Sequence, residues 1–171
     1  MEKQTSLEKE WIQSLGSHDP DLALSAVYEI RNSGSVKILP HLFSMIHKET
    51  PVEVRTEILK LLSDIKAPEA VPYIIESLQK NDFGEFLPAF VAACWQSGLD
   101  FSDHLRIFAL LFIQGDYITS LEAFTLLEEA FPNASDQARI DCIHFIRESE
   151  HMVIDEKLPL FRELRRVIEA I

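Results

Sequence analysis

Histidine, cysteine and carboxylate side chains are the groups from which a metal site would be built, and in this chain they are scattered. The only neighbouring cysteine and histidine are Cys142 and His144, which point in different directions if they lie on a helix. None of the six histidines is followed by glutamate; they are His18, His41, His47, His104, His144 and His151. Because metal ligands cluster, the sequence predicts structural histidines and no metal site.

Motifs of catalysis and phosphate binding are missing from the sequence. It contains neither G-x-S-x-G nor H-E-x-x-H, and its five glycines are too isolated to form a phosphate loop. The carboxylate pairs Glu128/Glu129 and Glu148/Glu150 are close in sequence only, whereas a catalytic pair needs a cleft and a raised pKa. We therefore expect solvated helix faces at these pairs, no catalytic residue, no cofactor, and a protein that is not an enzyme.

A row of polar and aromatic side chains is expected on one face of successive helices. Tyrosine and arginine in such a row are the residue types that most often anchor protein interfaces. The residues predicted to bind a partner are Lys37, His41, Ser44, Tyr73, Glu76 and Arg106. The alternative is an ordinary exposed helix face, since any array of repeated helices presents some such row.

The stretch from Thr50 to Lys80 shows which elements position this row. Thr50 is a suitable N-cap, and Pro51 follows at the first helical position, where its missing N–H costs nothing. The first helix is expected to end just before Pro68, and a second helix to follow to about residue 79. Apolar residues recur at helical spacing in both, as Val54, Ile58, Leu61, Leu62 and Ile65, then Val71, Ile74, Ile75 and Leu78.

The same pattern recurs along the chain. Capping residues recur at offsets of 31, 32 and 34 residues, at Asp19, Thr50, Asp82 and Asp116. The turns inside the pairs recur every 32 residues, at Gly34, Lys66 and Gly98. Near-constant spacing of caps, turns and apolar stripes indicates stacked repeats.

The sequence therefore predicts an all-α fold of about ten helices, with stacked antiparallel helix pairs forming a right-handed α-solenoid. We expect a single solenoid domain over residues 1–171, with a capping helix in 1–16, four helix pairs in 17–149 and a capping helix in 155–171. The expected helices are 4–15, 20–32, 35–48, 51–66, 68–79, 83–97, 101–114, 117–131, 135–149 and 156–170.

Two segments carry a resemblance to a known family. The run Thr50-Pro-Val-Glu-Val-Arg55 resembles the first helix of a HEAT repeat, and Ala70–Ile74 and Ile38–Leu42 resemble its second helix. The resemblance covers residues 17–80 well, and from 81 to 149 only the helical rhythm persists. It implies a HEAT/armadillo-like superhelix with the second helices on the concave side. The His-Glu pairs of HEAT-like di-iron hydroxylases are not found in this chain.

Charge and composition narrow the partners. The net charge is −12, and residues 81–138 hold nine acidic residues against one basic residue, Arg106. This disfavours nucleic acid and anionic membranes, which are bound through Lys and Arg, and it disfavours a HEAT-like DNA glycosylase, whose groove is basic. No run approaches the ~18 apolar residues of a membrane helix. Cys94 and Cys142 are expected to be buried, reduced thiols, so we expect a cytoplasmic protein.

The functional hypothesis is a protein-interaction scaffold that docks a protein or peptide on its concave or acidic face. One alternative is an enzyme-accessory or cofactor-lyase-like HEAT protein that binds a small molecule in a concave pocket. A second alternative is a homo-oligomer whose self-contact uses aromatic residues of the third pair: Phe83, Phe86 and Phe101. Trp95 is expected in the core, because it shares a stripe with Val91 and Cys94.

Overall fold

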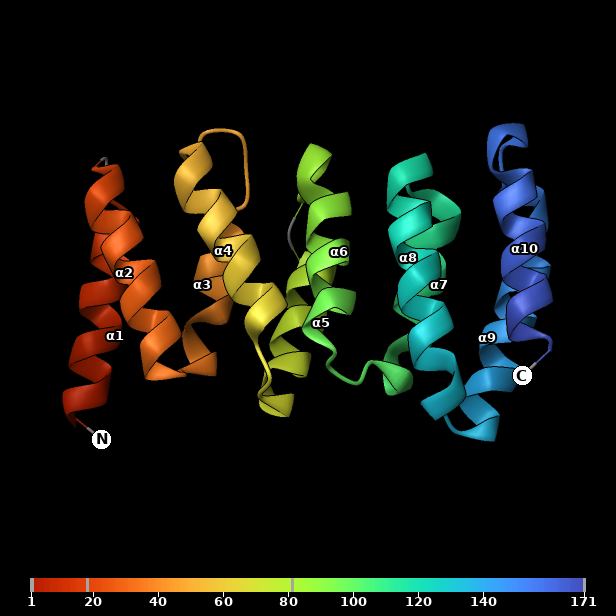
Figure 1. The fold of residues 1–171 in the computed structure, drawn as a ribbon, viewed down its shortest axis with the longest axis horizontal. Coiled ribbons are helices and arrows are strands. Elements are labelled where there is room, and N and C mark those ends of the chain that lie inside the picture. The colour runs from red at the N-terminus through yellow and green to blue at the C-terminus, as the bar shows by residue number, and fades with distance from the viewer. Residues whose placement is uncertain (1, 18, 81, 171) are drawn as a thin grey trace. The chain divides into compact units, whose positions relative to one another are not determined.

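The structure is a computed structural model that describes residues 2–17, 19–80 and 82–170. Over these ranges the chain is all-α and 82% helical, with ten α-helices and no strand (Figure 1). The helices are α1 (Glu2–Leu15), α2 (Pro20–Ser33), α3 (Leu39–Ser44), α4 (Val52–Asp64), α5 (Val71–Lys80), α6 (Leu87–Ser97), α7 (Leu105–Gln114), α8 (Tyr117–Ala130), α9 (Asp136–Glu148) and α10 (Leu158–Ile168).

Helix contacts gather into two compact units, one ending at Phe86 and the other beginning at Leu87. In the first unit α1 packs against α2, α2 against α4, and α3 against α5. In the second unit α8 packs against α6, α7 and α10, while α9 packs against α7 and α10. First helices therefore contact first helices (α2 with α4, α6 with α8) and second helices contact second helices (α3 with α5, α7 with α9), while α8 also packs against α7, a second helix. The single solenoid domain stays a prediction.

Short 3-10 turns begin most of the second helices. Val36–Ile38 precedes α3, Pro68–Ala70 precedes α5, and Ser102–His104 precedes α7. In α3, α5, α6 and α10 the second residue is proline, at Pro40, Pro72, Pro88 and Pro159. A proline fits the first turn of an α-helix because its missing N–H would be unpaired there.

Two of the predicted N-caps are confirmed as side-chain caps. Asp19 accepts a hydrogen bond from the Asp21 amide at 3.0 Å, and Asp116 accepts one from the Thr119 amide at 2.7 Å. The prediction for Thr50 is wrong. Helix α4 has Pro51 as its N-cap with no side-chain bond, because the Thr50 hydroxyl contacts His47 instead.

The prediction that the second helix of the first pair runs to residue 48 is also wrong, because α3 ends at Ser44. The Arg55 guanidinium donates to the carbonyl oxygens of His47 (3.0 Å) and Thr50 (2.9 Å). These bonds satisfy loop carbonyls that have no helical partner, so they favour an irregular segment over further helical turns.

Phenylalanines dominate the core of the second unit, where Phe90, Phe108, Phe112 and Phe161 are fully buried. Burying each such side chain contributes about 1.5–3 kcal/mol. The aromatic surface expected for self-contact is not exposed. Two of its members, Phe83 and Phe101, are buried, and Phe86 is half-buried, with the Arg55 guanidinium 4.0 Å from its ring centroid.

Candidate functional site

Five of the six predicted partner-binding residues lie in the first unit, on neighbouring elements. Lys37 lies in the 3-10 turn before α3, His41 and Ser44 lie on α3, and Tyr73 and Glu76 lie on α5, which packs against α3. All are exposed except Tyr73, which is half-buried. The Ser44 hydroxyl donates to the His41 carbonyl oxygen at 2.8 Å, and Glu76 pairs with Lys80 one turn later.

Arg106, the sixth predicted residue, lies on α7 in the second unit. It is exposed, and its guanidinium lies 4.2 Å from the centroid of the Phe145 ring on α9. A cation over an aromatic face in this geometry contributes about 0.5–1 kcal/mol at an exposed site. Arg106 therefore already has a partner within its own unit, and its continuation of the row from His41 and Tyr73 stays a prediction.

A cavity of about 410 Å³, here called the α3 cavity, lies in the first unit beside two residues of this row. It borders the end of α3, where the predicted helix would have continued. His41 and Ser44 form part of its wall, together with polar groups of the loop after α3. Its lining residues are Ile12, Leu15, Gly16, Ser17, Pro20, Ala23, His41, Ser44, Met45, His47, Glu49, Thr50 and Pro51.

Three loop residues at this cavity form a chain of polar contacts. His47 Nδ1 lies 2.9 Å from Glu49 Oε2, and His47 Nε2 lies 3.2 Å from Thr50 Oγ1. Backbone hydrogen bonding, followed by the His47 contact, lowers the pKa of Glu49. Hydroxyl, imidazole and carboxylate occur here in the order of a catalytic triad. With Thr50 only 6% exposed, however, its hydroxyl offers a substrate little access, and the contacts serve to fix the loop.

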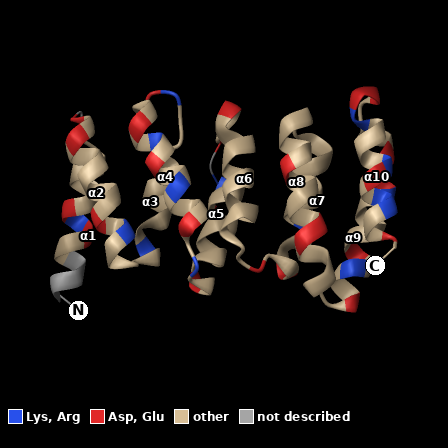
Figure 2. Cartoon of the chain, in the orientation of Figure 1, with Lys and Arg blue, Asp and Glu red and all other residues tan. Residues whose placement is uncertain are grey.

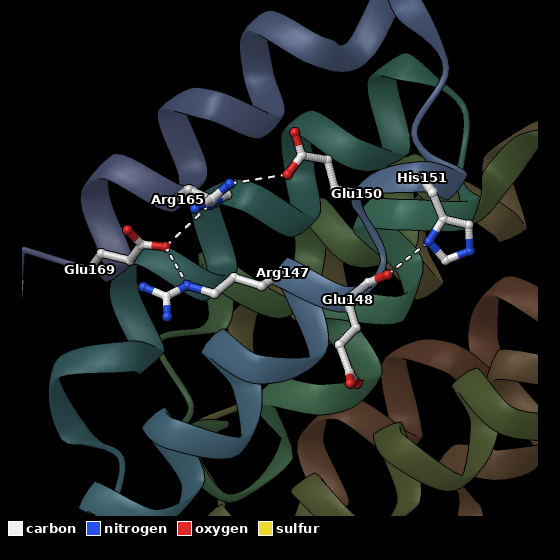
Figure 3. A network of polar contacts seen from close by, with 6 residues as sticks. All are labelled: Arg147, Glu148, Glu150, His151, Arg165 and Glu169. Atoms are coloured by element: carbon white, nitrogen blue, oxygen red, sulfur yellow. Dashed lines mark hydrogen bonds and ion pairs between the residues drawn. The ribbon is translucent and has the colours of Figure 1, made fainter.

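The Glu150 carboxylate belongs to a network that joins α9 and the turn after it to α10, whereas Glu148 takes part only through its backbone carbonyl oxygen, which lies 2.8 Å from His151 Nδ1 (Figure 3). Arg147 Nε and Arg165 Nε donate to Glu169 Oε1 at 3.0 and 3.2 Å, and Arg165 Nη1 donates to Glu150 Oε2 at 3.1 Å. The Arg147 contact is the main cause of a lowered pKa at Glu169. A general acid needs a raised pKa, so this network is suited to joining two helices and not to proton transfer.

Lys157 is a charged residue that the sequence analysis did not single out. It is 2% exposed, and its ammonium donates to the carbonyl oxygens of Ile113 (2.7 Å), Gly115 (2.8 Å) and Phe112 (3.2 Å). The Ser120 hydroxyl lies 3.2 Å away. Burial lowers the pKa of Lys157, and the Asp116 carboxylate partly opposes this. The ammonium therefore caps the C-terminal end of α7.

One sequence signal could have pointed to Lys157. It stands directly before Leu158-Pro159, and the residues that precede the equivalent Leu39-Pro40 and Val71-Pro72 are the buried Ile38 and Ala70. A lysine in a position that is otherwise apolar and buried indicates a specific partner for its charge.

Both cysteines are buried and free, as predicted. Burial raises the pKa of both thiols, that of Cys142 to about 12, so neither is a reactive nucleophile.

In the described residues no group of three or more His, Cys, Asp or Glu side chains is arranged to hold a metal ion. His18 lies outside the described residues. No helix in the described part of the chain is long and apolar enough to cross a membrane.

A second cavity, of about 420 Å³ and here called the Trp95 cavity, lies in the second unit between the ends of α6 and α8. The expectation that Trp95 is core is correct only in part, because the side chain is half-buried and lines this cavity. The indole Nε1 donates to Glu122 Oε2 at 2.8 Å, which fixes the ring.

In comparisons with protein-family models, curated proteins and solved structures, the chain gives no significant match.

Proposed function

We propose that the chain is a non-enzymatic binding module, a right-handed HEAT-like α-solenoid that docks a protein or peptide on the row formed by α3 and α5. The observation that carries this proposal is that His41 and Ser44, chosen from sequence alone, border the α3 cavity. An interface anchor needs a pocket into which a partner side chain can be desolvated. Stacked repeats offer an extended surface for the remainder of a segment. We place this activity in the cytoplasm because both thiols are buried and unpaired.

The test is affinity capture from native lysate with three immobilised proteins: the wild type, a His41→Ala/Tyr73→Ala variant and a Tyr28→Ala variant. Tyr28 is 47% exposed on α2 and lies outside the row, so its substitution is a matched control. We expect a protein captured by the wild type and by the control to be lost from the row variant, with all three giving the same circular dichroism and melting temperature. Capture that the row variant retains would show that the row is not the binding face.

Arg106→Ala is tested as a separate variant, because Arg106 belongs to the second unit. Loss of the same captured protein would extend the binding face to α7. Retained capture would confine the face to the first unit and leave Arg106 with its Phe145 contact alone.

A small-molecule ligand in the α3 cavity is the second candidate function. It is favoured by the polar groups at that cavity, where His41, Ser44, His47 and Glu49 all contribute to the lining. A few convergent polar groups in a pocket that also has apolar walls are typical of ligand sites. Differential scanning fluorimetry with a panel of small carboxylic acids, amines and nucleosides tests it. A genuine hit stabilises the wild type but not Ser44→Trp, whose indole would block the cavity mouth.

A further inference from the structure

Each unit has a cavity at an equivalent position, and the two cavities differ in the residues that line them. The buried residues of α2 match those of α6 when the two helices are compared at an offset of 64 residues: Val27 and Ile30 then correspond to Val91 and Cys94. The buried residues of α4 match those of α8 at an offset of 65 residues. The four buried residues of α4, Val54, Ile58, Leu61 and Leu62, correspond to the buried Thr119, Ala123, Leu126 and Leu127.

In the first unit an arginine of the chain itself occupies this place. Arg31 Nη1 lies 3.2 Å from Asp64 Oδ2, and Arg31 Nη2 lies 3.7 Å from Glu57 Oε2. The guanidinium, from the last turn of α2, thus contacts two carboxylates of α4, that of Glu57 in the middle of the helix and that of Asp64 at its C-terminal end. The cavity beside it measures about 190 Å³.

In the second unit the carboxylates are kept and the cation is lost. Trp95 corresponds to Arg31, and its indole donates to Glu122, the counterpart of Glu57. The counterpart of Asp64 is Glu129, which is exposed and lines the Trp95 cavity. No hydrogen bond or ion pair of the Glu129 carboxylate is found within the described residues. The cavity here measures about 420 Å³, larger than its counterpart.

Other features of the Trp95 cavity also favour a cation. It lies at the C-terminal ends of α6 and α8, where the helix dipoles concentrate negative potential. Its lining contains a second carboxylate, Asp100, whose Oδ1 accepts from the Ser102 amide at 2.9 Å, and no Lys or Arg. The charged residues along α6 to α8 are mostly acidic, as Figure 2 shows.

We propose that the Trp95 cavity receives an arginine side chain from a basic segment of a partner protein, at the place that Arg31 holds in the first unit. Its guanidinium pairs with the Glu129 carboxylate and lies against the Trp95 indole. Arginine is preferred to lysine because the planar guanidinium binds carboxylates through several donors and stacks on aromatic rings. The inference rests on the proposed function as a protein-binding module and names the chemistry of the partner.

The probe is an acetylated and amidated Gly/Ser hexapeptide with two arginines, compared with the same peptide carrying citrulline, a neutral isostere. Binding is followed by ¹⁵N NMR on the two indole N–H signals. Trp11 is an internal control, because its Nε1 is held by Glu29 at 2.8 Å as that of Trp95 is held by Glu122. We expect a saturable shift of the Trp95 signal with the arginine peptide, and none at Trp11.

Glu129→Gln should weaken this binding by up to about fivefold, the factor that corresponds to the upper end of the range for one exposed ion pair. Citrulline should weaken it similarly, whereas Glu128→Gln, an exposed neighbour outside the cavity lining, should change it less than about twofold. Trp95→Arg, which restores the arrangement of the first unit, should abolish binding while the chain stays folded by circular dichroism; because this variant has no Trp95 indole, binding is followed on the backbone amide of Gly98, which lines the same cavity.

A Trp95 signal that does not shift would overturn the proposal. Equal losses of peptide affinity in Glu128→Gln and Glu129→Gln would also overturn it, because they would show that the peptide is attracted to the acidic surface in general and not to this cavity. This failure is distinguishable from failure of the proposed function. A partner that is captured by the wild type, lost from the His41→Ala/Tyr73→Ala variant and retained by Glu129→Gln would leave the binding module standing without this pocket.

Discussion

The Lys157→Met substitution is the perturbation whose effect the structure defines most closely. The side chain is 2% exposed, and its ammonium supplies hydrogen-bond donors to Phe112, Ile113 and Gly115. These carbonyls lie at the C-terminal end of α7, where no further helical turn follows to satisfy them. Methionine keeps the length and apolar stem of lysine but removes every donor.

The magnitude follows from two opposing contributions. Each buried carbonyl left without a donor costs about 1–3 kcal/mol. Two are affected, those of Ile113 and Gly115, because the Phe112 carbonyl keeps the Ser120 hydroxyl as a donor at 2.7 Å. Methionine, on the other hand, avoids the cost of desolvating the ammonium, which is several kcal/mol for a buried ion. We therefore expect a net loss of about 1–3 kcal/mol in unfolding free energy. For a chain of this size that corresponds to a melting temperature lower by about 2–12 °C.

Urea denaturation and scanning calorimetry of the wild type and Lys157→Met measure this loss. Lys48→Met is the matched control, because its side chain is 78% exposed and pairs with Glu49 only at 3.9 Å. The control should stay within about 0.5 kcal/mol of the wild type. Hydrogen exchange should accelerate in α10 and at the end of α7 in Lys157→Met alone. A Lys157→Met protein as stable as the control would refute the assignment of the ammonium as a cap.

Three further predictions concern the same unit. Gly115→Ala should destabilise by about 1–3 kcal/mol in calorimetry, because the new Cβ would lie 2.6 Å from the carbonyl oxygen of Leu111. Asp116→Ala should cost about 1 kcal/mol at neutral pH through loss of the cap. Because the backbone hydrogen bond lowers the pKa of Asp116 in the folded chain, this contribution is full above the unfolded value of about 3.9 and should vanish in acid titration as the pH falls through the folded value. Cys94 and Cys142 should resist a thiol reagent at pH 8 in the native protein and react on unfolding, since burial raises both thiol pKa values.

Periodicity and cap chemistry are local, and they predicted the all-α class and the ten helices of the described residues. The helices and the caps at Asp19 and Asp116 follow from residues within one or two turns. The end of α3 cannot be predicted from local residues. The buried Ile46 continues the apolar stripe of Leu39, Leu42 and Phe43, although it lies beyond the end of the helix. The helix is replaced there by a loop that Arg55, nine residues further on, holds through two carbonyls.

Lys157 shows a different limit of sequence reasoning. Its partners lie 37 to 45 residues away in the chain, so no local pattern could name them. The candidate binding residues were predictable only as an exposed row on successive second helices. The α3 cavity beside His41 and Ser44 depends on where α3 ends. Arg55, which lies on the next helix, holds the loop that follows this end.

Repeated positions give a sequence signal that is neither local, like a helix cap, nor hidden, like the partners of Lys157. Arg31 and Trp95 both stand three residues before a turn glycine, at Gly34 and Gly98, so their equivalence can be read from the sequence. What the sequence does not show is that Arg31 lies against Asp64, and that Glu129, the counterpart of Asp64, has no cation beside it in the part of the chain that the structure describes. When stability alone shapes a repeat, loss of the arginine should relax the need for the acid. A retained carboxylate beside an enlarged cavity instead indicates that a cation is supplied from outside the chain.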